Sequence, residues 1–151
     1  MSDPCGRHIM AELYQCNPVI LNDLSRLQKI LVDAALLAGA EVREVTFNKS
    51  NSTQISGVVL ISNSHLAIHT FSQQRYASLD IYTFNQRLNP NEAYNYISNQ
   101  LQASWSLVKE LYRGCGEILE RSLDTNQIAE QIAEQSPDEV EALLKLVPNY
   151  E

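Results

Sequence analysis

Apolar residues recur at every second position along several short stretches of the chain, which is the pattern of β-strands that bury one face. Ile9, Ala11 and Leu13 show this alternation in the first stretch. The predicted strands are Arg7–Tyr14, Glu41–Phe47, Ile55–Ile61, His65–Phe71, Tyr76–Phe84 and Trp105–Tyr112. The polar run Asn48–Gln54 predicts a loop between two of them.

Two other stretches repeat their apolar residues at helical spacing. One extends from about Val19 to Ala38 and is followed by Gly39, which suits a helix C-terminal cap. The other begins at Asn89-Pro90, with proline just inside the helix. These elements predict an α+β fold: a two-layer sandwich of a mainly antiparallel sheet with two amphipathic helices on one face.

The C-terminal segment differs from the rest of the chain in charge. Residues 1–116 hold nine acidic and nine basic side chains, whereas residues 117–151 hold nine acidic and two basic ones, which accounts for the net charge of −7. We therefore expect a domain over residues 1–116 and an acidic helical tail over residues 117–151. The tail is either a solvated appendage that packs one apolar stripe on the domain or a segment that binds a partner protein.

Composition narrows the class of protein further. No apolar stretch approaches the ~20 residues that cross a bilayer, and we expect no signal peptide and no membrane association. Nucleic-acid binding needs a basic face, which the sequence does not predict. Cys5, Cys16 and Cys115 are odd in number and lack the spacing of a zinc site, so we expect free thiols and a cytoplasmic location.

The histidines give little evidence of chemistry by themselves. His65 and His69 are four residues apart, but their segment is predicted as a strand, and the acid of a helical zinc motif is missing. We therefore expect no metal site, and a hydrogen-bonded structural role is the default for these side chains. Pattern alone predicts an α+β domain without a defined function.

Three sequence blocks carry a resemblance that goes further. They are Gly6-Arg7-His8-Ile9-Met10-Ala11-Glu12-Leu13-Tyr14-Gln15-Cys16, Ile55-Ser56-Gly57-Val58-Val59-Leu60-Ile61-Ser62 and Ser64-His65-Leu66-Ala67-Ile68-His69-Thr70. In this order and at these separations they resemble the bacterial and archaeal S-adenosylmethionine decarboxylases, of which this chain looks like a divergent member.

The resemblance implies self-cleavage between Asn63 and Ser64. The Ser64 hydroxyl attacks the carbonyl of Asn63, the resulting ester is eliminated, and hydrolysis of the dehydroalanine leaves a pyruvoyl group at residue 64. This group forms a Schiff base with the substrate amine and serves as the electron sink for decarboxylation. By the same resemblance, His69 is the processing base and Ser56 assists cleavage.

Several family positions differ in this chain. The family has glutamate where Asn63 stands, and its catalytic acid is a cysteine where Phe84 stands. Its Trp-Pro-Glu is replaced by Phe71-Ser72-Gln73, and an aromatic residue that stacks on adenine is replaced by Ser50. The self-processing residues are retained, whereas the losses fall on substrate binding and turnover. Tyr82 and His65 are the candidates to replace the missing acid, because phenylalanine cannot donate a proton.

The expected function is decarboxylation of S-adenosylmethionine for spermidine synthesis by a homodimer or larger homo-oligomer. Two alternatives stay open. The weakened adenosine contacts suit a pyruvoyl-dependent decarboxylase of arginine or ornithine. The loss of the acid at Phe84 suits a non-catalytic paralogue that acts as a binding or regulatory partner.

Overall fold

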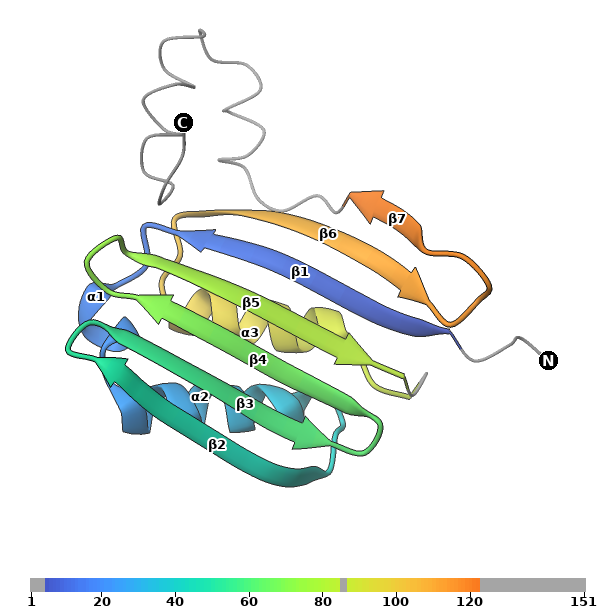
Figure 1. Cartoon of the computed structure of the whole chain (residues 1–151), viewed down its shortest axis with the longest axis horizontal. Coiled ribbons are helices and arrows are strands. Elements are labelled where there is room, and N and C mark those ends of the chain that lie inside the picture. The colour runs from blue at the N-terminus through green and yellow to red at the C-terminus, as the bar shows by residue number, and fades with distance from the viewer. Residues whose placement is uncertain (1–4, 85–86, 123–151) are drawn as a thin grey trace, which may run out of the picture.

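The computed structural model describes residues 5–84 and 87–122, which form one antiparallel sheet with helices on one face (Figure 1). The sheet has seven strands in the order β2-β3-β4-β5-β1-β6-β7. The strands are β1 Gly6–Tyr14, β2 Val42–Asn51, β3 Gln54–Ile61, β4 Ser64–Phe71, β5 Tyr76–Thr83, β6 Trp105–Arg113 and β7 Leu119–Ser122. The helices are α1 Pro18–Leu21, α2 Leu24–Leu37 and α3 Pro90–Gln100. The predicted α+β sandwich is confirmed.

The hydrophobic core lies between the sheet and helices α2 and α3, which Figure 1 shows on the same side of the sheet. Alternate residues of the central strands point into this layer, and their side chains are almost completely buried. They include Ile9, Leu13, Ile55, Ile68, Leu79 and Ile81 from the sheet and Leu27, Leu31 and Ile97 from the helices. None of the helices in the described part of the chain has the length and apolar character needed to span a membrane.

The helix predicted from Val19 to Ala38 is divided in two. Helix α1 ends at Leu21, and α2 begins at Leu24 after Asp23, whose carboxylate accepts a hydrogen bond of 3.1 Å from the backbone N–H of Arg26. An aspartate in this position satisfies a backbone donor that the first helical turn leaves unpaired, so it favours a new helix start. Gly39 follows α2 with φ of +91°, and its predicted capping role is confirmed.

The prediction of a loop over Asn48–Gln54 is wrong for most of that segment. Strand β2 continues to Asn51, and β3 begins at Gln54, so only a tight turn separates them. The Asn51 side chain holds this turn by accepting a 2.9 Å hydrogen bond from the Thr53 backbone N–H. The segment is polar because β2 is an edge strand whose last residues are exposed to solvent, not because its backbone is irregular.

The prediction of a helical tail from residue 117 is also wrong at its start. Leu119–Ser122 forms β7, which pairs with β6 from Lys109↔Ser122 to Tyr112↔Leu119. The fully buried carboxylate of Glu110 contributes to this attachment, because it accepts hydrogen bonds from Arg7 of β1 at 2.5 Å and Arg121 of β7 at 3.2 Å. The predicted helices of the tail beyond Ser122 lie outside the described residues.

The prediction of three free thiols is corrected as well. Cys5 and Cys115 form a disulfide with Cα atoms 5.6 Å apart, although 110 positions separate them in sequence. Cys16 is free and buried, and burial raises the pKa of its thiol to about 12, which leaves it unreactive at neutral pH.

Candidate active site

The predicted site residues divide between the two faces of the sheet. Because side chains alternate along a strand, Ser64 of β4 points to the helix-covered face, while His65 and His69 point to the opposite face, called the outer face below. Both histidines lie on one strand with Ser64, yet neither shares its face.

Ser64 lies at the tight turn that joins β3 to β4. It pairs with Ile61, and only Ser62 and Asn63 separate these two strand ends. Asn63 has φ of +61°, a left-handed conformation that asparagine tolerates better than most residues. The peptide bond predicted to break therefore lies in a strained turn, with the Ser64 side chain only 3% exposed.

The Ser64 hydroxyl is fixed by the backbone at position 84. The N–H of Phe84 donates a hydrogen bond of 2.9 Å to Oγ of Ser64. This contact puts position 84 beside the predicted cleavage point, and it does not depend on the side chain at that position. The contact that orients Ser64 is therefore kept although Phe84 stands where the resemblance predicts a cysteine.

Ser56 and His69 form a second pair farther along the outer face. They are opposite each other in the β3–β4 ladder, and Oγ of Ser56 lies 2.7 Å from Nδ1 of His69. His69 is five residues from Ser64 along β4, a separation of roughly 17 Å at ~3.4 Å per residue, and it lies on the other face. The structure therefore joins Ser56 to His69 but does not bring His69 to Ser64 within one chain.

A group of polar side chains lies on the outer face at the end of the sheet where Ser64 lies, called the Ser64 end below. Nε2 of His8 is 2.9 Å from Oδ1 of Asp80. Tyr82 lies between two imidazoles, with ring centroids 6.1 Å from His8 and 5.7 Å from His65. The guanidinium carbon of Arg113 is 4.8 Å from the centre of the Tyr82 ring. The two candidate replacement acids, Tyr82 and His65, are therefore neighbours.

His65 has an environment that disfavours its charged form. Burial lowers the pKa of His65, and the electrostatic influence of His8 and Arg113 lowers it further, while Asp80 acts in the opposite direction. The imidazole is consequently neutral at neutral pH.

Sequence reasoning missed His8, Asp80 and Arg113. They come from β1, β5 and β6, which are far apart along the chain and become neighbours only through strand pairing. The sequence did show that each of these residues lies on a predicted strand or at its end, and His8 pairs directly with Tyr82 between β1 and β5. That signal could be used only after the strand order was known.

An aromatic row lies at the other end of the outer face, called the Phe71 end. Neighbouring rings stack at 5.5 Å between Phe71 and Tyr76, 5.4 Å between Tyr76 and Tyr14, and 4.2 Å between Tyr14 and Trp105. The phenols of Tyr76 and Tyr14 both donate hydrogen bonds to Glu12. Burial and the Glu12 charge raise the pKa of Tyr14 to about 12, so this network stays protonated on its tyrosines.

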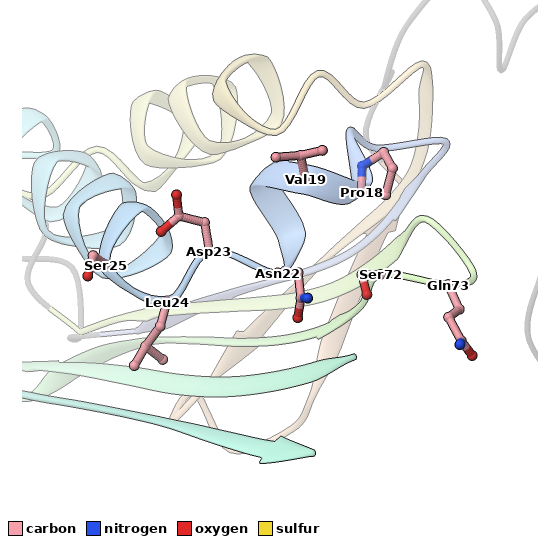
Figure 2. A pocket seen from close by; sticks show the side chains of 8 residues that line it. All are labelled: Pro18, Val19, Asn22, Asp23, Leu24, Ser25, Ser72 and Gln73. Atoms are coloured by element: carbon pink, nitrogen blue, oxygen red, sulfur yellow. The ribbon is translucent and has the colours of Figure 1, made fainter. Parts of the chain in front are cut away.

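A cleft of about 730 Å³ also lies at the Phe71 end, between α1, the start of α2 and the β4–β5 turn (Figure 2). It is lined by Pro18, Val19, Asn22, Asp23, Leu24, Ser25, Ser72 and Gln73. Because this cleft and Ser64 lie at opposite ends of β4, the cleft is not the site of cleavage in the same chain. Within the described ranges, no three histidine, cysteine or acidic side chains are grouped to hold a metal ion.

Comparison with known proteins identifies the family. The family model for S-adenosylmethionine decarboxylase matches residues 7–114. The S-adenosylmethionine decarboxylase proenzyme 2 of Halalkalibacterium halodurans is 54% identical over 116 residues, covering 77% of this chain and 91% of the relative. The S-adenosylmethionine decarboxylase proenzyme of Caldicellulosiruptor saccharolyticus is 49% identical over 112 residues, covering 74% of this chain and 90% of the relative.

A solved structure gives the same result for the fold. The adenosylmethionine decarboxylase of Aquifex aeolicus superposes with a TM-score of 0.68 at 26% identity, covering 77% of this chain and 96% of that one. The matched part of the sequence contains the Ser64 turn, the Ser56–His69 pair and the group around Tyr82. The chain belongs to the S-adenosylmethionine decarboxylase family.

Proposed function

We propose that this chain is a proenzyme that cleaves itself between Asn63 and Ser64 and then decarboxylates S-adenosylmethionine. The observation that carries the proposal is the Ser64 turn. The nucleophilic hydroxyl is buried and held by the Phe84 N–H, next to a carbonyl in a left-handed turn. Family membership supplies the reaction type.

The proposed cleavage is the reaction that the family resemblance implies. Oγ of Ser64 attacks the Asn63 carbonyl carbon, the peptide C–N bond breaks, and an ester replaces the amide. Removal of the Ser64 α-proton then expels the Asn63 carboxylate, and hydrolysis of the resulting dehydroalanine releases ammonia. The pyruvoyl group left at residue 64 supplies the electron sink for decarboxylation. A buried serine at the turn fits this precursor role.

We also propose a homodimer in which the two outer faces meet. The predicted site positions divide by sheet end: Ser64 and Phe84 lie at one end, and Ser56, His69 and Gln73 lie toward the other. A two-fold axis that lies between the facing sheets and runs across the strands exchanges these ends, so it carries the His69 of one copy toward the Ser64 end of the other.

Exposed apolar side chains support the same arrangement. Met10, Val58, Leu60 and Leu107 all lie on the outer face, and each is 37–45% exposed in the single chain. A sheet normally buries both faces of its central strands or keeps one face polar. Covering these residues with a second copy removes them from water, which favours association.

The substrate proposal takes account of the family positions that differ. Ser50 is exposed on β2 and has no ring to stack on adenine, and Gln73 has an uncharged amide in place of a carboxylate. We therefore expect weaker binding of S-adenosylmethionine than a member with all family contacts shows. A panel of S-adenosylmethionine, arginine and ornithine distinguishes the proposed substrate from the basic amino acids. The cytoplasmic location remains a proposal.

Intact mass spectrometry tests the cleavage. After reduction with dithiothreitol, which opens the Cys5–Cys115 bond that would otherwise join the fragments, the purified protein is expected as two fragments, residues 1–63 and 64–151, with a pyruvoyl group at the start of the larger one. Ser64→Ala should stay a single chain because it has no hydroxyl to attack, and Ser62→Ala is the matched control that should still be cut. A wild-type sample that remains at full length would refute the proposal and favour the non-catalytic alternative.

A further inference from the structure

The Cys5–Cys115 disulfide lies directly beside the residues that enclose Tyr82. Cys5 precedes Gly6, and Cys115 follows Arg113 by two residues. Gly6 and Arg113 are themselves opposite each other in the last pair of the β1–β6 ladder. The disulfide therefore closes the ladder just beyond its terminal pair.

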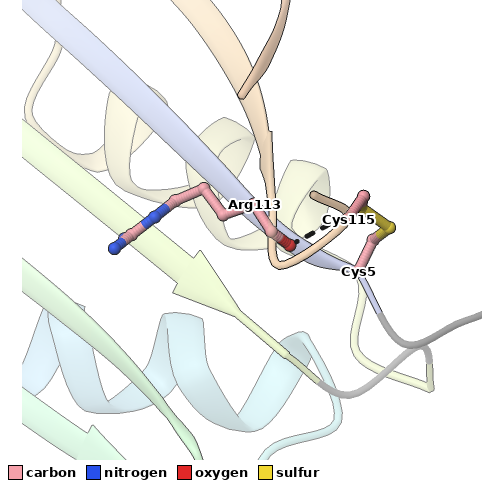
Figure 3. The surroundings of a disulfide bond; sticks show 3 residues. All are labelled: Cys5, Arg113 and Cys115. Carbon is pink, nitrogen blue, oxygen red and sulfur yellow. Dashed lines mark hydrogen bonds between the residues drawn. A yellow bond between two sulfur atoms is a disulfide. The ribbon is translucent and has the colours of Figure 1, made fainter. Parts of the chain in front are cut away.

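Both ends of that terminal pair contact the Tyr82 ring. A Cβ atom at Gly6 would collide with the Tyr82 phenol, so the ring packs directly over the glycine backbone. The Arg113 guanidinium lies over the same ring at 4.8 Å. Figure 3 shows the Arg113 side chain pointing away from the disulfide, across β1 toward β5, where Tyr82 lies.

The segment around Cys115 joins β6 to β7, and its two glycines add little to fix it between these paired strands. Gly114 and Gly116 have φ of +87° and +91°, and a Cβ atom at Gly116 would meet nothing within 4 Å. Glycines lose the most conformational freedom on ordering, and the ends of ladders fray first. A covalent link between Cys115 and Cys5 removes that freedom at the point where the ladder ends. Both cysteines are partly exposed, so a small thiol can reach the bond.

We propose that the Cys5–Cys115 disulfide is a thiol-responsive clamp that holds Arg113 over Tyr82 at the Ser64 end of the sheet. Two molecules of a small thiol reduce the bond, giving two cysteine thiols and one disulfide of the small thiol. The reduced ladder end frays, and Arg113 leaves the ring. The effect on turnover rests on the proposed function, whereas the clamp itself does not.

The charge of Arg113 also reaches beyond Tyr82. Together with burial and His8, it holds the pKa of His65 below its usual value. Release of Arg113 therefore changes the surroundings of both candidate proton donors. Reduction or formation of the Cys5–Cys115 disulfide then alters proton transfer at the Ser64 end of the sheet without any change to Ser64.

Nuclear magnetic resonance of the full-length protein tests the clamp without measuring turnover. The protein is first equilibrated with oxidised glutathione and then reduced with dithiothreitol. Intact mass shows whether the bond opens, either as a gain of two hydrogens in an uncut chain or as separation of the two fragments in a cut one. Reduction is expected to shift the ring resonances of Tyr82, because Arg113 leaves the ring. The Arg113 amide is expected to lose its protection from hydrogen exchange, because the ladder end frays. If Cys5 and Cys115 do not form a disulfide in oxidised glutathione, the proposal is overturned.

Variants separate the clamp from general stability. The double variant Cys5→Ser, Cys115→Ser should show the reduced spectrum and ignore dithiothreitol, whereas Cys16→Ala should respond as the wild type does. Arg113→Gln should shift the Tyr82 resonances before reduction while amide protection persists. If the bond is cut and the Tyr82 resonances do not move, the clamp does not exist, whatever the outcome of the cleavage experiment.

Discussion

Complementation between two inactive variants tests whether the processing site is shared between copies. Ser64→Ala removes the nucleophile, and His69→Ala removes the predicted base. Neither chain alone should be cut efficiently. A mixed dimer, however, has one site that combines the Ser64 of the His69→Ala chain with the His69 of the Ser64→Ala chain. Cleavage should therefore return when the two are expressed together.

The expected size of the effect follows from the geometry. Within one chain, His69 and Ser64 are roughly 17 Å apart along β4 and on opposite faces, because strand residues rise ~3.4 Å each. A base must come within about 3 Å of the proton that it removes, or act through one water. The base of the same chain is therefore too distant. With equal amounts and random pairing, about half of the dimers are mixed, so about half of the His69→Ala chains should be cut.

Mass spectrometry of differently tagged chains measures this fraction. Only the His69→Ala chain should yield fragments, and a partner carrying both substitutions should restore no cleavage to it. Mixed dimers are confirmed by affinity capture on one tag and detection of the other. The shared-site argument fails if mixed dimers are present and the His69→Ala chain stays intact, or if His69→Ala alone is cut at the wild-type rate.

Three further predictions concern turnover and stability. With S-adenosylmethionine, the wild type should show low activity that decays as alanine appears at residue 64, because a positioned acid contributes ~10²–10⁴-fold to the rate and Phe84 cannot donate a proton. Mass spectrometry of residue 64 during turnover measures this, and Phe84→Cys should raise activity. Fast, sustained turnover by the wild type would contradict the prediction. Burial, His8 and Arg113 lower the pKa of His65, so the unfolded state binds more protons than the folded state does. Stability should therefore fall as pH drops below 6.5, the ordinary pKa of histidine. In thermal melts, His65→Gln should flatten this dependence of stability on pH, and an unchanged dependence would contradict the prediction. Glu110→Gln should cost about 2–3 kcal/mol in urea unfolding because it removes the buried carboxylate charge that pairs with the partly buried Arg7. Arg121→Gln, at an exposed side chain, should cost under ~1 kcal/mol, and equal losses would show that burial is not decisive.

The sequence predicted the strands well where one face is buried and poorly where both faces are exposed. The alternation of Ile9, Ala11 and Leu13 survives in the structure because the helix layer covers that face. The end of β2 carries no such signal, since Asn48–Asn51 is an exposed edge whose pairing is made by backbone atoms. Polarity there reports exposure to solvent, and a local pattern cannot distinguish an exposed strand from a loop.

Contacts between distant segments were beyond a reading of local patterns. Cys5 and Cys115 are 110 positions apart, and their pairing depends on Gly6 facing Arg113 across the β1–β6 ladder. The same dependence hid the His8–Asp80 contact, which joins β1 to β5. In both cases the residue types were visible in the sequence, while the strand order that makes them neighbours was not.

The separation of Ser64 from His69 is different, because the sequence already contained it. Ser64 directly precedes the predicted strand His65–Phe71, and once that strand is extended to Ser64, an odd spacing of five places the two side chains on opposite faces. The retained family residues could therefore not have formed a site within one copy of such a strand. The structure adds the sheet ends and the Ser56–His69 contact, and in the proposed dimer the second copy is the source of the base. A processing site that is complete only in the dimer links self-cleavage to assembly, so the protein should be cut only after its chains have paired.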